Sequence, residues 1–145
     1  MSLPVTWRPH RSRRMAVVLG SVVMITMITL AVTVAPPFTV PDRIGLVLFG
    51  LAITGLLYLL GRCRVSADAA GLTLVNPART RRLAWAEVLG VNMADGEPWP
   101  TLDLADGSTV SAMGIQRSDG ARARQALAEL RALLHERGEA PDPTA

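Results

Sequence analysis

Two long apolar segments separated by prolines dominate the first half of this 145-residue chain. The first, residues 15–35, contains no charged residue and no His, Asn or Gln. As a helix, about 21 residues span about 31 Å, which matches a bilayer core of about 30 Å. The second, residues 44–61, is also uncharged and lies near the lower length limit for a span. We therefore expect a two-helix transmembrane hairpin, because only helices satisfy their own backbone hydrogen bonds in lipid.

The link of residues 36–43 and the flanking arginines predict how the hairpin is oriented. The link contains three prolines and is too short to be a domain, so we expect a tight external loop. It holds one arginine, Arg43, whereas six flank the two segments: Arg8, Arg11, Arg13, Arg14, Arg62 and Arg64. By the positive-inside rule, this distribution places both termini in the cytoplasm. Residues 1–14 are then a basic cytoplasmic arm.

A cleaved signal peptide and a twin-arginine export signal are the alternatives for the N-terminus. The apolar region is longer than the roughly 7 to 15 residues of a signal peptide, and Pro36 directly follows the small-residue site. Arg13 and Arg14 resemble a twin-arginine pair, but a basic run before a first helix usually sets topology. The second apolar segment also favours a retained hairpin.

Positive charge lies close to the predicted membrane segments, and negative charge lies farther along the chain. Residues 62–82 contain five Arg and one Asp, whereas residues 83–145 contain five Arg and ten acids. This pattern argues against a nucleic-acid partner, for which a basic face on the folded domain is expected. The single cysteine, Cys63, cannot form an internal disulfide, which fits a reducing cytoplasm. It is either a buried strand thiol or, beside a helix end, an acylation site.

Alternation of apolar and polar residues with period two begins after Arg62 and predicts an antiparallel meander. In the fourth strand we expect Leu89, Val91 and Met93 to point inward. The pair of residues 106–107 is Asp-Gly between alternating runs, which predicts a two-residue hairpin turn. The expected strands are residues 62–66, 72–75, 81–85, 88–94, 99–105 and 108–113.

After the strands the apolar period becomes 3.6 residues, which predicts one amphipathic helix that covers the sheet. Ser118 is the expected N-cap and Gly138 the stop. Each buried leucine contributes about 1.5 to 3 kcal/mol, a large share of a small domain's stability. Residues 138–145 are expected to be a disordered tail. The expected apolar stripe comprises Ala123, Ala126, Leu127, Leu130, Leu133 and Leu134.

A meander of strands followed by an amphipathic helix resembles a pleckstrin-homology (PH) domain. Residues 68–72, 81–88 and 114–120 are similar to small actinobacterial PH-like proteins that have two N-terminal membrane helices, the low-molecular-weight protein antigen six type. The resemblance covers about residues 62–137. It implies a membrane-anchored PH-like domain, a partly open antiparallel barrel capped by a C-terminal helix, with Trp85 as a core aromatic. It implies no established activity.

Five arginines are candidates for contact with an anionic membrane surface, where each contributes about 1 kcal/mol. The alternative is that they are solvated or only determine topology. Eukaryotic PH domains that bind phosphoinositides carry basic residues in the first hairpin loop. Here that loop, residues 66–71, is acidic and small, which argues against such a site. The five candidates are Arg62, Arg64, Arg79, Arg81 and Arg82.

Trp99 lies between two prolines and is the candidate contact for a protein partner, since aromatic residues are enriched at binding hot spots. The alternative is core packing or loop closure. No catalytic, cofactor or metal arrangement is expected. His10 and His135 lack a second ligand at suitable spacing. Asp103 and Asp106 have no His or Ser partner in a recognisable arrangement.

The sequence therefore predicts a non-enzymatic integral membrane protein whose cytoplasmic PH-like domain binds or scaffolds a protein partner. One alternative is an anionic-lipid or envelope-stress sensor that uses the juxtamembrane arginines. Another is an accessory subunit of a membrane enzyme or transporter complex. Gly50 and Thr54 form a small-xxx-small pair, which favours close helix packing either within the hairpin or in a homo-oligomer.

Overall fold

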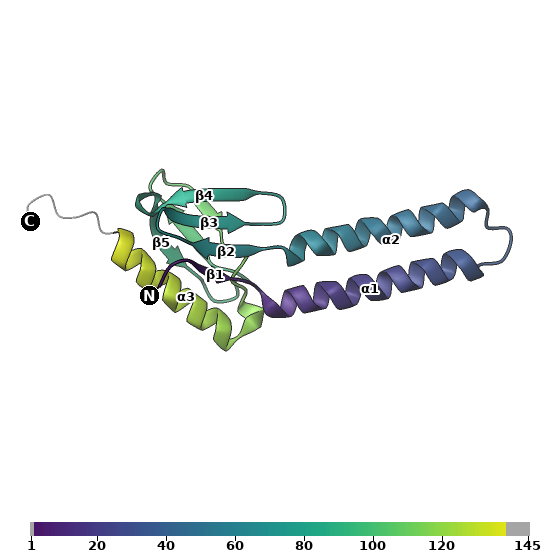
Figure 1. Cartoon of the computed structure of the whole chain (residues 1–145), viewed down its shortest axis with the longest axis horizontal. Coiled ribbons are helices and arrows are strands. Elements are labelled where there is room, and N and C mark those ends of the chain that lie inside the picture. The colour runs from purple at the N-terminus through teal and green to yellow at the C-terminus, as the bar shows by residue number, and fades with distance from the viewer. Residues whose placement is uncertain (1, 139–145) are drawn as a thin grey trace, which may run out of the picture. The chain divides into compact units, whose positions relative to one another are not determined.

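The computed structural model describes residues 2–138, which form two compact units (Figure 1). One unit is a helical hairpin of residues 11–62. The other, called here the β domain, combines residues 2–10 with residues 63–138. This division corrects the prediction that residues 1–14 form a separate arm, because residues near the N-terminus contribute a strand to the β domain. The predicted tail lies outside the described residues from position 139 onward.

The hairpin consists of helices α1 (His10–Thr33) and α2 (Val40–Gly61), both long and apolar enough to cross a membrane. Each helix begins earlier than the predicted spans of residues 15–35 and 44–61. For α2 the reason is local: Pro41 is tolerated in a first helical turn, where its missing N–H has no partner anyway. The Thr39 backbone N–H and hydroxyl also donate to Asp42 Oδ2, at 2.8 and 2.7 Å.

Small residues on α2 pack against α1. A Cβ atom added at Gly50 would lie 3.0 Å from Met27 Cγ, so only glycine fits there without a shift. The hydroxyl of Thr54 donates to the Gly20 carbonyl at 3.4 Å. The small-xxx-small pair is therefore used within the hairpin, as one of its two interpretations predicted.

Arg43 closes the loop between the two helices. Its Nη1 donates to the carbonyl oxygens of Ala31 and Val32 at 2.8 and 3.3 Å, and its Nη2 donates to the Val34 carbonyl at 2.8 Å. The last carbonyls of a helix have no partner within that helix, and they carry partial negative charge. The arginine fork therefore satisfies the C-terminus of α1 from the first turn of α2.

Replacing Arg43 by Met should lower the unfolding free energy of the hairpin by at least about 1.5 kcal/mol, because hydrogen bonds to a charged donor are lost. Arg43→Lys should give an intermediate unfolding free energy, since the lysine ammonium keeps the charge but cannot form the several hydrogen bonds of the planar guanidinium. The measurement is an SDS titration of the detergent-solubilised chain, followed by helical circular dichroism. The control Arg14→Met removes an exposed arginine elsewhere. Equal stability of Arg43→Met and Arg14→Met would contradict this role.

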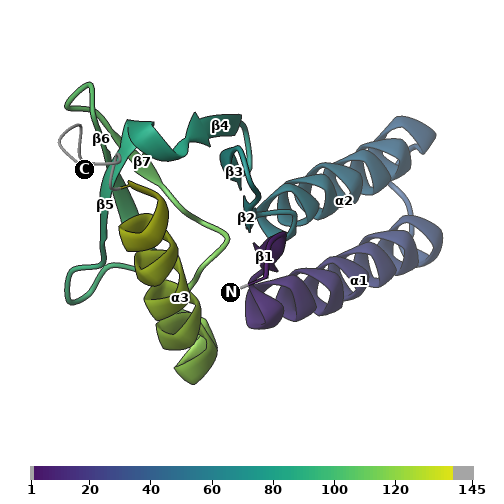
Figure 2. The same ribbon diagram turned by 60° about the vertical axis from the view of Figure 1, so that its left-hand side comes forward.

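The β domain contains two antiparallel sheets that are not joined into a closed barrel (Figures 1 and 2). The larger sheet has the order β1-β2-β3-β4 and the smaller has the order β5-β6-β7. After the smaller sheet come η2 (Arg117–Asp119) and α3 (Ala121–Gly138), so the predicted PH-like architecture is confirmed. The other elements are β1 (Val5–Trp7), β2 (Arg64–Ala67), β3 (Gly71–Val75), β4 (Thr80–Ala84), η1 (Trp85–Glu87), β5 (Val88–Asn92), β6 (Thr101–Leu104) and β7 (Thr109–Ser111).

Strand β1 was not predicted. Its three residues are too few to display a period of two, and they pair with β2 so that Val5 lies opposite Ala67 and Trp7 opposite Val65. Trp7 is buried, and its indole Nε1 donates to Glu129 Oε2 of α3 at 2.8 Å. The segment before the first helix is therefore part of the domain core.

Strand β5 contains an irregularity that changes which side chains face the core. The pairing with β6 shifts register between Val88 and Gly90, which inserts Leu89 as an extra residue. Val88 is buried, whereas Leu89 is 71 % exposed. The prediction that Leu89 points inward is therefore wrong, because a β-bulge interrupts the alternation on which it rested. Val91 does pack against the core, as predicted.

The β6–β7 turn has three loop residues, not the predicted two. The Gly107 N–H donates to the Leu104 carbonyl at 3.0 Å, and the Leu104 N–H donates to the Ser108 carbonyl at 2.9 Å. Gly107 has a φ of 80°, whereas no non-glycine residue in the described part of the chain has positive φ, so a type I′ turn is excluded. Hydrogen bonds from the Ser108 hydroxyl and N–H hold the pKa of Asp106 below its ordinary value.

Helix α3 covers the sheets with the predicted stripe, in which Leu130 and Leu133 are fully buried and Leu127 only partly. Ser118 is not its N-cap. It lies within η2, and the first helical bond runs from the Arg124 N–H to the Gly120 carbonyl at 3.2 Å. The α-helix therefore begins after Gly120, and it is described as far as Gly138, where the stop is predicted.

Gly114 marks a close approach of the segment after β7 to β2. A Cβ atom there would lie 2.4 Å from the Arg64 carbonyl carbon and from the Val65 nitrogen. Gly114→Ala should cost about 1 to 3 kcal/mol, as overpacked core sites do. At about 4–8 °C per kcal/mol for a domain of this size, its thermal midpoint should fall by at least about 4 °C. Gly90→Ala is the control because that site has open space, and a similar fall in both variants would contradict this account.

Candidate binding site

The arginines that were predicted to face lipid do not share one surface of the β domain. Residues opposite each other in an antiparallel pair lie on the same face. Arg82 pairs with Thr73, on the outer face, whereas Arg81 pairs with the buried Leu74, so these neighbours lie on opposite faces of β4. Arg64 is exposed on β2, and Arg62 belongs to the helical unit.

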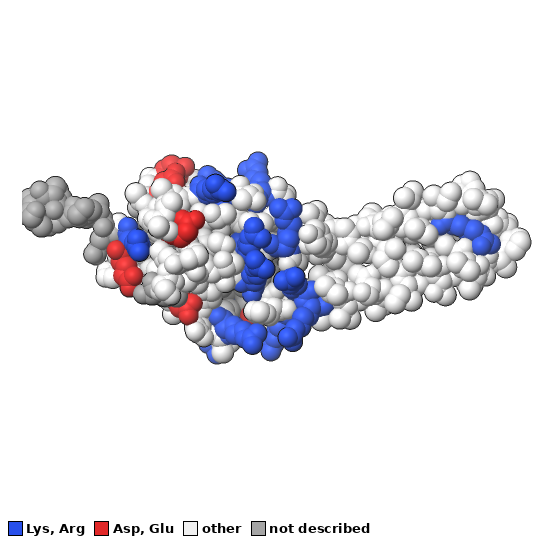
Figure 3. Space-filling view, viewed as in Figure 1, with Lys and Arg blue, Asp and Glu red and all other residues white. Residues whose placement is uncertain are grey.

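An exposed basic surface nevertheless exists on the larger sheet. Figure 3 shows basic side chains gathered around the end of the β domain where the β3–β4 turn lies, with acidic side chains toward its other end. Arg64, Arg79 and Arg82 are exposed, and within residues 2–138 none of them forms an ion pair. These three arginines can therefore meet an anion without first breaking a salt bridge.

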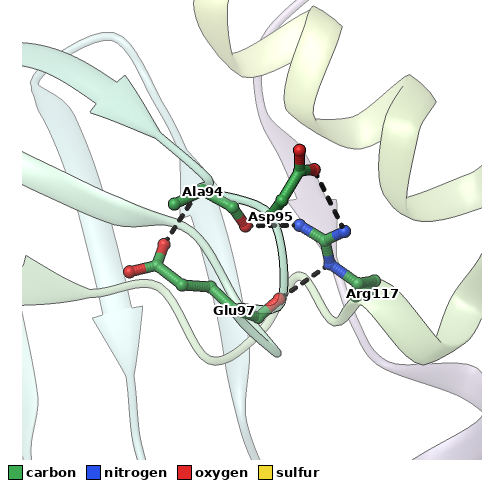
Figure 4. Close-up of polar contacts among 4 residues, drawn as sticks. All are labelled: Ala94, Asp95, Glu97 and Arg117. Carbon is green, nitrogen blue, oxygen red and sulfur yellow. Dashed lines mark hydrogen bonds and ion pairs between the residues drawn. The ribbon is translucent and has the colours of Figure 1, made fainter.

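The loop before β6 is braced by Arg117 (Figure 4). Its Nε donates to the Glu97 carbonyl at 2.8 Å and its Nη2 to the Ala94 carbonyl at 2.6 Å, while Nη1 lies 3.9 Å from Asp95 Oδ1. The Glu97 carboxylate in turn accepts a hydrogen bond from the Ala94 N–H at 2.9 Å. Sequence reasoning missed Arg117, because its partners are backbone carbonyls about twenty residues away.

Trp99, the predicted partner contact, is half-buried at the end of this loop. It lines a shallow pocket of about 410 Å³ together with Pro98, Gln116 and Arg117. Part of the indole thus packs and part remains accessible. A role for Trp99 in partner binding stays a prediction.

Replacing Arg117 by Met should loosen the loop of residues 94–98. The loss of hydrogen bonds to a charged donor, about 1.5 kcal/mol or more, should speed local amide exchange at Glu97 about tenfold. Hydrogen exchange followed by mass spectrometry measures this protection. Arg124→Met on α3 is the matched control, since Arg124 is exposed and outside the loop. An unchanged exchange rate in Arg117→Met would contradict this role, because the loop would then be stable without the arginine.

A groove between β5 and α3 is the second accessible feature. It has a volume of about 350 Å³, and Leu89 is the one large apolar side chain of the β domain, among the residues described, that is classed as exposed. A glycine inside a strand often marks a bulge, so Gly90 was the sequence signal that could have indicated an outward Leu89. The groove is lined by Ala86, Val88, Leu89, Gly90, Val91, Arg131, Leu134, His135 and Gly138.

The remaining site prediction concerned the thiol. Cys63 is buried, as one of its two interpretations predicted, so the acylation alternative has no accessible sulfur in this structure. Trp85, the core aromatic that the resemblance implied, is also buried, and its Nε1 donates to the Asp68 carbonyl at 3.1 Å. Both residues therefore serve packing.

Comparison with known proteins supports the architecture and gives no activity. Residues 62–133 match the family model described as "Bacterial PH domain". Similar relatives include the uncharacterized proteins Mb1452 of Mycobacterium bovis and Rv1417 of Mycobacterium tuberculosis, each 35% identical over 97 residues. The match covers 67% of this chain but only 63%, less than two thirds, of each relative. No solved structure matches the chain.

Proposed function

Since residues 62–133 belong to the bacterial PH domain family, we propose that the chain is a non-enzymatic membrane protein whose PH domain binds and positions a protein partner. In this proposal, α1 and α2 cross the inner membrane twice and leave both termini in the cytoplasm. One observation carries this proposal. Leu89 is an exposed aliphatic side chain on the edge strand β5, and it lines a groove between β5 and α3.

An exposed leucine alone needs no explanation, but its setting does. The bulge at Val88–Gly90 turns Leu89 away from a core that its strand otherwise supports. Bulges commonly re-aim a side chain next to a functional site. Leu134 of α3 adds a second apolar side chain to the lining of the same groove. These features support a surface on which another protein packs.

The covalent links to the helices support a partner at or near the membrane. Only two residues separate β1 from α1, and only two separate α2 from β2. Two residues span at most about 7 Å, so the domain has little reach away from the helix ends. A partner that is itself in the membrane, or held near it, meets this constraint.

A second candidate function is recognition of anionic lipid by the exposed arginines. It is favoured by Arg64, Arg79 and Arg82, which form no ion pair within residues 2–138. Each arginine near an anionic surface contributes about 1 kcal/mol, and added salt weakens this attraction. A third candidate function is that of an accessory subunit of a membrane enzyme or transporter complex. Such a subunit would copurify in detergent with the other subunits at a fixed stoichiometry.

In-cell crosslinking tests the proposal. A photoreactive amino acid is placed separately at Leu89, Trp99 and Arg82 of the full chain, with exposed Thr109 on β7 as the control position. We expect one defined protein to be captured at Leu89 or Trp99, in higher yield than at Thr109, with its identity obtained by mass spectrometry. Capture of lipid at Arg82, with no protein at Leu89 or Trp99, would overturn the proposal in favour of lipid recognition.

A further inference from the structure

Strand β5 has a free edge. It lies at the end of the three-stranded sheet and pairs with β6 on one side only. The other edge of such a strand presents backbone N–H and C=O groups that can pair with another strand. Helix α3 runs beside β5 (Figure 2), and residues of β5 and α3 together line the groove.

One charged side chain lines the groove. It is Arg131, and no Asp or Glu lines the groove within the described residues. Glu87 lies beside β5 in sequence but is turned away, because its Oε2 accepts a hydrogen bond from the Ala84 N–H at 2.6 Å. The groove therefore combines an apolar side chain, a cation and unpaired backbone groups.

On the basis of the proposed function, we propose that this groove binds an extended segment of the partner, which adds to the free edge of β5 as a strand. One aliphatic side chain of the segment packs against Leu89, and an Asp or Glu pairs with Arg131. Strand addition of this kind takes affinity from main-chain hydrogen bonds and specificity from alternate side chains. The Val88 N–H already donates to the Trp85 carbonyl, so the segment pairs with residues 89–92 and is about four residues long, at about 3.3 Å each.

Two other occupants fit the groove less well. A helix satisfies its own backbone groups, so it cannot pair with the free edge. A second copy of this chain brings the same arginine to the interface and supplies no acid from its own groove. An extended acidic and aliphatic peptide satisfies the edge, the leucine and the charge together.

The test uses the full chain in lipid nanodiscs and a phage-displayed library of random seven-residue peptides. We expect the selected peptides to share an acidic residue and an aliphatic residue two or more positions apart. Leu89→Asn and Arg131→Glu should each weaken binding of a selected peptide at least tenfold. Arg124→Glu, an exposed arginine on the same helix outside the groove, should leave binding unchanged. A peptide with Lys in place of its acid should regain affinity for Arg131→Glu.

Backbone methylation of the peptide tests strand addition directly. Methylating every second amide removes one of the two sets of N–H donors, so only one of the two methylated peptides should lose binding. Equal binding of both methylated peptides would overturn the proposal, as would selection of no peptide or insensitivity to Leu89→Asn and Arg131→Glu. Binding of the same peptides in helical form would overturn it as well.

These outcomes separate the inference from the proposed function. If a partner is crosslinked at Trp99 and no peptide binds at β5, the proposed function is supported and the peptide site at β5 is excluded. If peptides bind at β5 as expected but no cellular protein is captured at Leu89 or Trp99, the peptide site at β5 is supported and the proposed function is contradicted.

Discussion

The pairing of β1 with β2 connects parts of the chain that the whole helical hairpin separates in sequence. Trp7 lies opposite Val65, is buried, and is tied to α3 through Glu129. One strand before the hairpin and one after it thus enter the same sheet. Each of the two links between this sheet and a helix is two residues long.

The smaller sheet owes its accessible surface to one bulge. The inserted residue in β5 keeps Val88 and Val91 toward the core and leaves Leu89 outside it. Since the two sheets do not close, the edge of β5 also keeps unpaired backbone groups. A strand edge and an exposed aliphatic side chain are hazards for aggregation, so proteins usually cover or charge them. A groove that receives a partner segment gives both features a purpose.

Charge in the β domain is used in two different ways. Arg117 is committed to holding a loop, because its guanidinium bonds to the carbonyls of Ala94 and Glu97. Arg64, Arg79 and Arg82 have no acidic partner in the described part of the chain and remain available on the outside of the larger sheet. Arginine therefore holds a loop by hydrogen bonds at one place and remains accessible to a ligand at another. Only the contacts of each arginine distinguish the two roles.

The sequence by itself determined the two apolar helices, the meander and the covering helix, because these depend on periodicity and length that short stretches carry. The buried stripe of α3 follows from such a local pattern. Only the tertiary structure decided the strand at Val5–Trp7, the outward Leu89 and the opposite faces of Arg81 and Arg82. Each of these depends on which strand lies alongside and in which register, and strand pairing between distant segments leaves little trace in local sequence.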